Sequence, residues 1–194
     1  MILLSNVKNK RKIIILFLCF FICACDSQKG KIQEAISQLL LKPMEIPYGQ
    51  MKCLTNDSLL EISPWKTAKL KLVHYVDSAT CSTCFLKKIT TYDQLFRLEE
   101  DYNNTFINVF VVEPGQKDKD RLYSDFENGE LPTTLFVDTA HVFVKSNPMI
   151  PKYSILHTFL LDENNTVIFV GCPTANPHMM KMIVQKVEDY LGRR

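Results

Sequence analysis

The sequence lacks the features that mark several large classes of protein. Its 194 residues contain no internal repeat and no low-complexity segment, which argues against a repeat architecture. No apolar run reaches the 20 or so residues that a membrane-spanning helix needs, since residues 13–22 form a run of only ten. Charge of one sign is not in excess either, with 23 basic and 21 acidic residues. These absences favour an ordinary globular chain of one domain with a modest extension.

The small basic excess belongs to the N-terminus. Four basic residues at positions 8–12 precede the apolar run, and small residues follow it. This order is typical of a secretory signal. Once residues 1–24 are set aside, 19 basic and 21 acidic residues remain, a formal net charge of −2. The sequence therefore offers no basic patch for nucleic acid, and we expect no nucleic-acid partner.

The apolar run leads into Ile22-Cys23-Ala24-Cys25, which resembles a bacterial lipobox. The resemblance implies cleavage before Cys25 and attachment of lipid to its sulfur, which would hold the protein at a membrane surface. An uncleaved anchor and a plain signal peptide are the alternatives. On the lipoprotein interpretation, the chain is exported and faces the periplasm or the cell surface. Disulfides can form in that compartment.

Two cysteines, Cys81 and Cys84, stand three residues apart between two runs of different character. Residues 69–77 are rich in the β-branched and aromatic side chains that strands favour. After the cysteines, apolar side chains recur with a period of 3.6 residues up to Tyr102. The pattern predicts a strand, a short loop and then a helix.

This order suits thiol chemistry. The unpaired N–H groups and the positive dipole end of a helix stabilise a thiolate at its start. We therefore expect Cys81 to be the nucleophile and the more exposed thiol. Cys84, one turn on, can close a disulfide or resolve a mixed one.

A structural disulfide and half of a zinc site are the competing interpretations of this pair. Zinc would need Cys53, Cys172 or His74 as further ligands, and these do not form a second closely spaced pair. We therefore expect no metal and no cofactor. Whether Cys53 pairs with Cys172 stays open, because four cysteines allow three connectivities.

The remaining pattern alternates between helix and strand. Residues 26–31 are a polar tether, a helix is expected from Ile32 to Pro43, and residues 44–60 resemble a β-hairpin. Further strands are predicted at 105–113, 131–138, 154–162 and 166–171, and further helices at 117–126, at 139–146 and after Asn176-Pro177. Such alternation predicts an α/β fold, a central mixed sheet flanked by helices.

The strand, CxxC and helix resemble the thioredoxin superfamily, in particular its membrane-anchored thiol-disulfide oxidoreductases of the TlpA and ResA type. The resemblance implies a thioredoxin-like domain over residues 65–194, preceded by a tether and extension at 25–64 and the signal at 1–24. It further implies exchange of disulfides with partner proteins. Partners would be protein disulfides or dithiols, together with the membrane surface that the lipid on Cys25 contacts.

The family carries a cis-proline loop against its CxxC, and two segments here could supply it. Pro132-Thr133-Thr134 looks like one version of that loop. The strand after Leu156-His157, with its turn and following strand, looks like the version in TlpA relatives and accounts for all downstream elements. We favour the second alignment, which places Leu156 at the proline position and His157 facing the disulfide. A non-proline cis peptide costs about 3–4 kcal/mol, so we expect a trans bond there.

Other residues suggest weaker hypotheses. His74 and Asp77, on the strand before Cys81, could accept a proton from Cys84, although a buried histidine is the commoner outcome. Trp65 is expected to be a core residue. A peroxiredoxin-type peroxidase is disfavoured because residues 74–79 contain no proline. A binding or assembly lipoprotein with an idle disulfide remains the main alternative, and the missing proline at Leu156 is its best argument.

Overall fold

The computed structural model describes residues 29–56, 63–132 and 134–194. The predicted signal and Cys25 lie outside the described residues. The chain divides into two units, residues 1–38 and 39–194. The described part of the first unit, residues 29–38, is helical, as the apolar spacing from Ile32 predicts. The predicted tether is wrong for residues 29–31, which already belong to this helix. Within the described ranges, no helix combines the length and the apolar composition needed to cross a bilayer.

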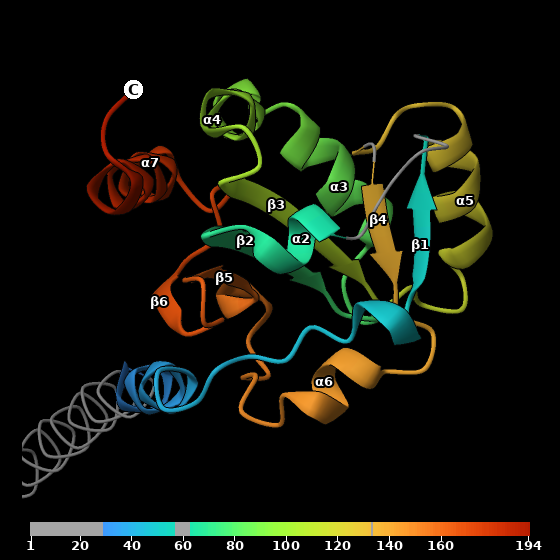
Figure 1. Cartoon of the computed structure of the whole chain (residues 1–194). Coiled ribbons are helices and arrows are strands. Elements are labelled where there is room, and N and C mark those ends of the chain that lie inside the picture. Colours follow the sequence, from blue (N-terminus) through green and yellow to red (C-terminus); the bar gives the residue numbers. More distant parts are fainter. Residues whose placement is uncertain (1–28, 57–62, 133) are drawn as a thin grey trace, which may run out of the picture. The chain divides into compact units, whose positions relative to one another are not determined.

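The second unit is built on a six-stranded mixed sheet (Figure 1). Its strands run in the order β1-β4-β3-β2-β5-β6. Strands β2, β3 and β4 are parallel, whereas β1, β5 and β6 each run antiparallel to their neighbours. The bounds are β1 Lys52–Thr55, β2 Leu70–Val76, β3 Phe106–Val112, β4 Thr134–Val137, β5 Thr158–Leu161 and β6 Val167–Val170. The predicted α/β class with a central mixed sheet is confirmed.

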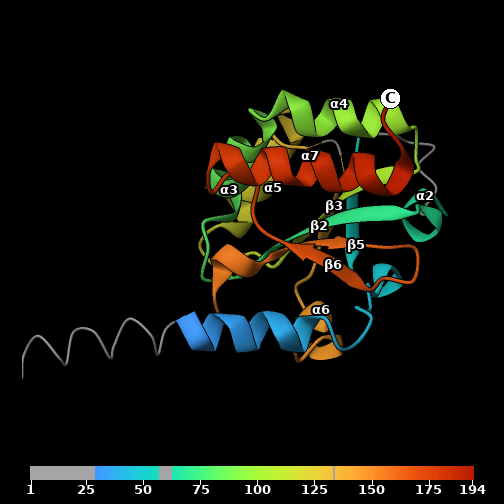
Figure 2. The same cartoon turned by 90° about the vertical axis from the view of Figure 1, so that its left-hand side faces the viewer.

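Helices cover both faces of this sheet (Figures 1 and 2). One face packs against α3 (Ser82–Thr90), α4 (Asp93–Tyr102), α5 (Lys119–Glu127) and α7 (Pro177–Leu191). The other packs against α2 (Ser63–Thr67), α6 (Val142–Ser146) and the segment around the 3₁₀ turn η1 (Tyr48–Gln50). A second 3₁₀ turn, η2 (Ser154–Leu156), precedes β5.

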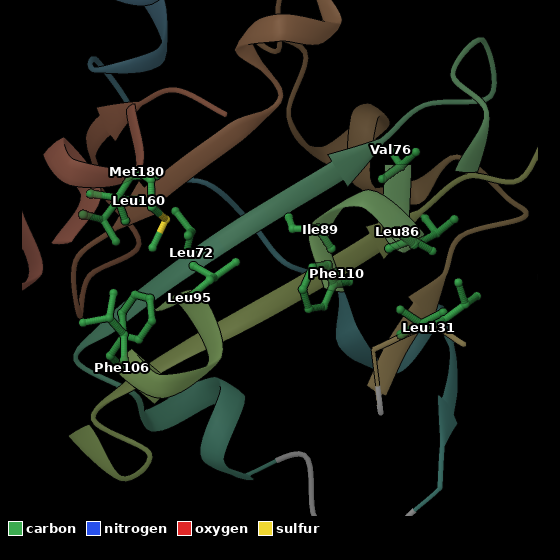
Figure 3. Packing of buried hydrophobic residues seen from close by; sticks show 14 of the residues in the cluster. Leu72, Val76, Leu86, Ile89, Leu95, Phe106, Phe110, Leu131, Leu160 and Met180 are labelled. Carbon is green, nitrogen blue, oxygen red and sulfur yellow. The ribbon is translucent and has the colours of Figure 1, made fainter. Parts of the chain in front are cut away.

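Every residue of the inner strands β2 and β3 is buried, because helices cover both of their faces. Figure 3 shows the hydrophobic core between the sheet and the helices α3, α4, α5 and α7. In this core, side chains of α3 and α4 lie over those of β2 and β3: Leu86, Ile89 and Leu95 over Leu72 and Phe110. The near-continuous apolar runs of the two strands follow from this double burial.

One helix after the cysteines was predicted, but the structure has two. α3 ends at Thr90, the backbone leaves helical angles at Tyr92, and α4 starts at Asp93. Hydroxyls before the break bond back to carbonyls: Thr90 Oγ1 donates to Lys87 O at 2.8 Å and Thr91 Oγ1 to Lys88 O at 2.7 Å. Such bonds and the β-branched side chains weaken a helix locally. The apolar period alone does not indicate the break, because α3 and α4 pack their apolar sides against the same core.

The extension at 44–60 is not a hairpin in its described part. It contains one strand, β1, which pairs antiparallel with β4 about 80 positions further on, as in Cys53 with Phe136. Local pattern could not reveal so distant a partner. The hairpin of β5 and β6 is confirmed, and its turn is held by Asp162, whose Oδ1 accepts the N–H groups of Asn164 and Thr166.

Candidate active site

The two cysteines stand at the carboxyl end of the central strand β2. Val76 ends that strand, and α3 begins at Ser82, with Cys81 as its N-cap. Cys81 and Cys84 form a disulfide, with their Cα atoms 5.3 Å apart. The predicted order of strand, loop, CxxC and helix is therefore confirmed.

The exposure of the two cysteines differs from the prediction. Cys84 is exposed, whereas Cys81 is only half-buried and not the more exposed of the two. The cause is the periodicity of α3. Its buried side is formed by Ser82, Thr83, Leu86 and Ile89, so that Cys84 lies on the outer side.

One hydroxyl group of its own helix contacts Cys81. Its Sγ lies 3.8 Å from Thr83 Oγ1, and the Thr83 side chain is fully buried. On the other side, Thr80 Oγ1 donates to Asp77 Oδ1 at 2.6 Å and fixes the loop that leads to Cys81. A thiolate at this position would accept a hydrogen bond from Thr83 and face the N-terminal end of the helix dipole. The Thr83 contact was missed from sequence, although its place inside the motif puts it in the first turn.

A cavity of about 320 Å³ lies beside the motif. Three distant segments line it: the residues flanking the cysteines, the turn before β5 and the loop after β6. The lining residues are Tyr75, Thr80, Phe85, Lys88, Ser154, Ile155, His157, Thr158, Cys172, Thr174 and Ala175. Lys88 Nζ donates to Thr174 O at 3.0 Å and ties α3 to the loop after β6. Ile155 is 59% exposed and leaves an apolar side chain at the border of the cavity.

Leu156 and His157 come directly before β5, which runs antiparallel to β2 with Thr158 opposite His74. Tyr75 N donates to His157 O at 2.9 Å, which fastens this turn to the end of β2. No described peptide bond is cis, so Leu156 has the trans bond expected for a non-proline. Pro132 lines a different cavity, together with Trp65 and Phe96. The structure therefore brings His157, and not Pro132, into the cavity that Thr80 and Phe85 line.

The His157 ring is buried and held from two sides. Its Nε2 lies 2.7 Å from Pro151 O, and its ring lies tilted against Tyr75 with ring centroids 5.0 Å apart. Its Nδ1 lies 3.5 Å from Asp77 Oδ2, an ion-pair distance at which no hydrogen bond forms. Asp77 thus lies between the loop of Cys81 and the turn before β5.

His74 is fully buried below the site. It stacks on Phe110 at 4.8 Å between ring centroids, and its Nδ1 lies 3.5 Å from Thr158 Oγ1. Burial lowers the pKa of His74 to about 3, and the Asn108 side chain opposes only part of that shift. The ring is neutral at neutral pH, so His74 is a poor proton acceptor for Cys84. It is buried, as the alternative expected, but only its Nδ1 has a hydrogen-bond partner.

The two remaining described cysteines are free. Cys53 lies on the edge strand β1, whereas Cys172 follows β6 at the opposite edge of the sheet. They cannot pair across that distance, which answers the open question of connectivity. Burial raises the pKa of Cys53. Among the described residues, no cluster of three or more His, Cys, Asp or Glu side chains has the geometry of a metal site.

Comparisons with known proteins support the fold. No protein-family model matches the chain, and no curated protein matches it either. A solved thioredoxin-like protein in its oxidised form, determined in solution, is similar at a TM-score of 0.52 and 18% identity. The match covers 76% of this chain and 95% of that one. A thioredoxin-like protein from Bacteroides caccae has a TM-score of 0.47 and 13% identity, over 84% of this chain and 55% of that one.

Proposed function

We propose, from a thioredoxin-like fold that carries a disulfide at the start of a helix, that this protein is a thiol-disulfide oxidoreductase acting on partner proteins. The observation that carries the proposal is the position of Cys81. It is the N-cap of α3, it contacts Thr83 Oγ1, and it follows a loop bordering a cavity open to solvent. Accessibility and a stabilised thiolate are what disulfide exchange requires.

The exchange balances over two steps. In the reducing direction, the Cys81 thiolate attacks one sulfur of a partner disulfide, forms a mixed disulfide and releases one partner thiolate. The Cys84 thiolate then attacks the Cys81 sulfur, closes the Cys81–Cys84 disulfide and releases the second partner thiolate. Two electrons pass to the partner, and the reverse sequence oxidises a partner dithiol.

The surroundings of Cys81 give it the role of attacking and leaving group. The first-turn N–H groups of α3 and the Thr83 hydroxyl stabilise its thiolate. Cys84 lies one turn into the helix, away from these donors. Because it is exposed, its thiolate can attack the mixed disulfide at Cys81. The cavity that Thr80, Phe85 and Ile155 line offers the partner segment a place beside the loop that leads to Cys81.

Turnover assays on four chains test the proposal: the wild type, Cys81→Ser, Cys84→Ser and the control Cys53→Ser, a free cysteine outside the cavity lining. Insulin reduction and the release of thionitrobenzoate from dithiobis-nitrobenzoate are the measurements. Cys81→Ser should lose at least about 100-fold in turnover, and Cys84→Ser should accumulate a mixed disulfide that mass spectrometry detects. Cys53→Ser should turn over like the wild type.

One alternative has a specific observation in its favour. Leu156 stands where the favoured alignment expects a proline, and its peptide bond is trans. A binding or assembly protein with an idle disulfide would share this feature. Wild-type protein without turnover, and without a trapped mixed disulfide in Cys84→Ser, would establish this alternative and exclude the first.

We also propose that lipid on Cys25 holds the domain at a membrane surface after export. The basic segment, the apolar run and Cys23-Ala24-Cys25 support this proposal. The test is expression of the whole chain and of Cys25→Ser in a bacterial host that lipidates proteins. The unaltered chain should sediment with membranes and carry the mass of acyl chains, and Cys25→Ser should do neither.

A further inference from the structure

The charges around the cysteines differ from those of the chain as a whole. Without residues 1–24, the chain has 19 basic and 21 acidic residues, a formal net charge of −2. Among the described residues that line the cavity beside the motif, none is Asp or Glu, and Lys88 carries a positive charge. Lys88 follows Cys84 by four residues on α3, and both side chains are exposed. Residues four apart on a helix lie on the same side of it, so this cation neighbours Cys84.

The ammonium of Lys88 is available to an incoming acceptor. Its Nζ donates to Thr174 O at 3.0 Å, which uses one of its three N–H donors. Within the described ranges, no carboxylate lies at ion-pair distance from it. The preceding Lys87 provides the contrast, because Asp125 and Glu130 both form ion pairs with it. Lys88 thus keeps two donors and an uncompensated charge.

A second uncompensated lysine lies close by. A smaller pocket of about 210 Å³ adjoins the cavity, since Tyr75 and His157 line both. Lys152 lines this pocket and forms no ion pair with another residue of the described part. The pocket has one acidic residue, Asp77, and both of its oxygens are engaged: Oδ1 accepts from Thr80 Oγ1 at 2.6 Å, and Oδ2 lies 3.5 Å from His157 Nδ1. Two lysines and one aspartate leave this surface positive.

The rest of the lining suits a peptide segment. Ser154 is exposed and supplies a hydroxyl donor, and the neighbouring Ile155 offers an apolar side chain to the partner. The cavity volume of about 320 Å³ lies at the lower end for ligand sites, so the cavity holds a few side chains of a partner.

We propose that the partner segment that docks here is acidic, with a carboxylate beside its reactive cysteine bound by Lys88 and attracted by Lys152. The inference rests on the proposed thiol-disulfide exchange and names the class of substrate for it. An ammonium and a carboxylate form a charge-assisted hydrogen bond, and opposite charges speed the encounter of the partners. The exchange is the one given above: Cys81 forms the mixed disulfide and Cys84 resolves it, so one protein disulfide forms for each partner disulfide reduced.

Three peptide disulfides of equal length test the proposal: the disulfide-linked dimers of acetyl-Glu-Cys-Glu-amide, acetyl-Gln-Cys-Gln-amide and acetyl-Lys-Cys-Lys-amide. Each is mixed with the reduced full chain at pH 7.5, and chromatography follows the release of peptide thiol. The rates with 2-mercaptoethanol give the intrinsic reactivity of each peptide. Relative to that reference, the Glu peptide should react at least about tenfold faster than the Gln peptide at low ionic strength, and the Lys peptide more slowly than either. In about 0.5 M NaCl the advantage should fall to about threefold or less, because salt screens exposed charges.

Three variants identify the cation. Lys88→Gln removes the charge and should lower the ratio of the Glu rate to the Gln rate at least about threefold. Lys88→Arg keeps the charge and a donor for Thr174 O, so it should keep the preference and separate the charge from the lost hydrogen bond. Lys66→Gln is the matched control, since this exposed lysine of α2 precedes β2 whereas the cysteines follow it. It should leave the ratio unchanged. Each result is a ratio between peptides, so a change in the pKa of Cys81 cancels.

Three results would overturn the proposal: equal corrected rates for the Glu and Gln peptides, a preference that salt does not reduce, or a preference that Lys88→Gln leaves intact. The first two comparisons use the unaltered chain, so they decide the matter even if Lys88→Gln folds poorly. A failure of the exchange itself would leave all three peptide disulfides unreacted. A failure of this inference alone would leave them reacting in the proportions found with 2-mercaptoethanol.

Discussion

The two cavities of the sheet are similar in size, about 320 and 280 Å³, but opposite in electrical character. None of the side chains lining the cavity beside the disulfide is a carboxylate, and Lys88 contributes a positive charge. The second cavity, which Trp65, Phe96 and Pro132 line, has two carboxylates and no cation among its described lining residues. A thiolate is favoured in the first setting and would be disfavoured in the second. One sheet thus carries two cavities of different charge, and only the positively charged one lies beside the cysteines.

The largest expected effect comes from Phe110, whose ring separates the two regions by stacking on His74 on one side and on Phe96 on the other. Phe110→Ala removes a ring that is 3% exposed, so the free energy of unfolding should fall by about 3–5 kcal/mol. Urea denaturation measures the loss. The control is Phe96→Ala, whose half-buried ring should cost about 1–2 kcal/mol. Equal losses would show that Phe110 is no more central to the core than a residue at its border.

His74 sharpens the comparison through pH. Its folded pKa of about 3 lies below the ordinary value of 6.5, so the unfolded chain takes up a proton first. Stability is therefore complete above pH 6.5 and is lost as the pH falls toward 3. Between pH 6.5 and 4.5 the loss should be about 2–3 kcal/mol. Urea denaturation of wild type and His74→Gln at both pH values should show this much extra loss in the wild type alone. An equal loss of unfolding free energy in the wild type and in His74→Gln would contradict the low pKa of His74.

Thr83 provides the next largest effect, on rate rather than on stability. Thr83→Val keeps the buried volume and removes the hydroxyl that contacts Cys81 Sγ at 3.8 Å. The pKa of the reduced Cys81 thiol should rise, and alkylation by iodoacetamide at pH 7 should slow about three- to tenfold. The pH dependence of that rate should shift to higher pH. Ser82→Ala, a neighbouring buried hydroxyl without a hydrogen-bond partner, is the control and should react like the wild type.

The smallest effect is expected at Ile155, the exposed apolar side chain at the border of the first cavity. Ile155→Ser should change the free energy of unfolding by less than about 0.5 kcal/mol, because the side chain is 59% exposed. The KM for insulin should nevertheless rise about three- to tenfold, since a partner segment loses an apolar contact. Turnover of the small dithiobis-nitrobenzoate should stay unchanged. A loss in both assays would argue against a role in partner docking.

The elements of the core were predictable because their patterns are local. Apolar runs identify β2 and β3, and Asn176-Pro177 marks the start of α7, where Met179 N donates to Asn176 Oδ1 at 2.9 Å. The predicted role of Trp65 as a core residue is confirmed as well. The break between α3 and α4 was not predictable from period alone, because two helices on one core continue the same stripe.

The site was predictable only in part, for a similar reason. The CxxC and its place before a helix can be read from adjacent residues. The walls of the cavity cannot, because they come from segments near Thr80, Ile155 and Cys172. The exposure of Cys84 depended on which side of α3 faces the sheet, which its own motif does not specify.

The sequence by itself determined the fold class, the disulfide pair and its place at a helix start, because propensity, period and spacing act between near neighbours. The tertiary structure alone decided that β1 pairs with β4, that Cys53 and Cys172 stay apart, and that His74 is fully buried. Each of these depends on which distant segments meet, and burial and charge compensation exist only once they have met.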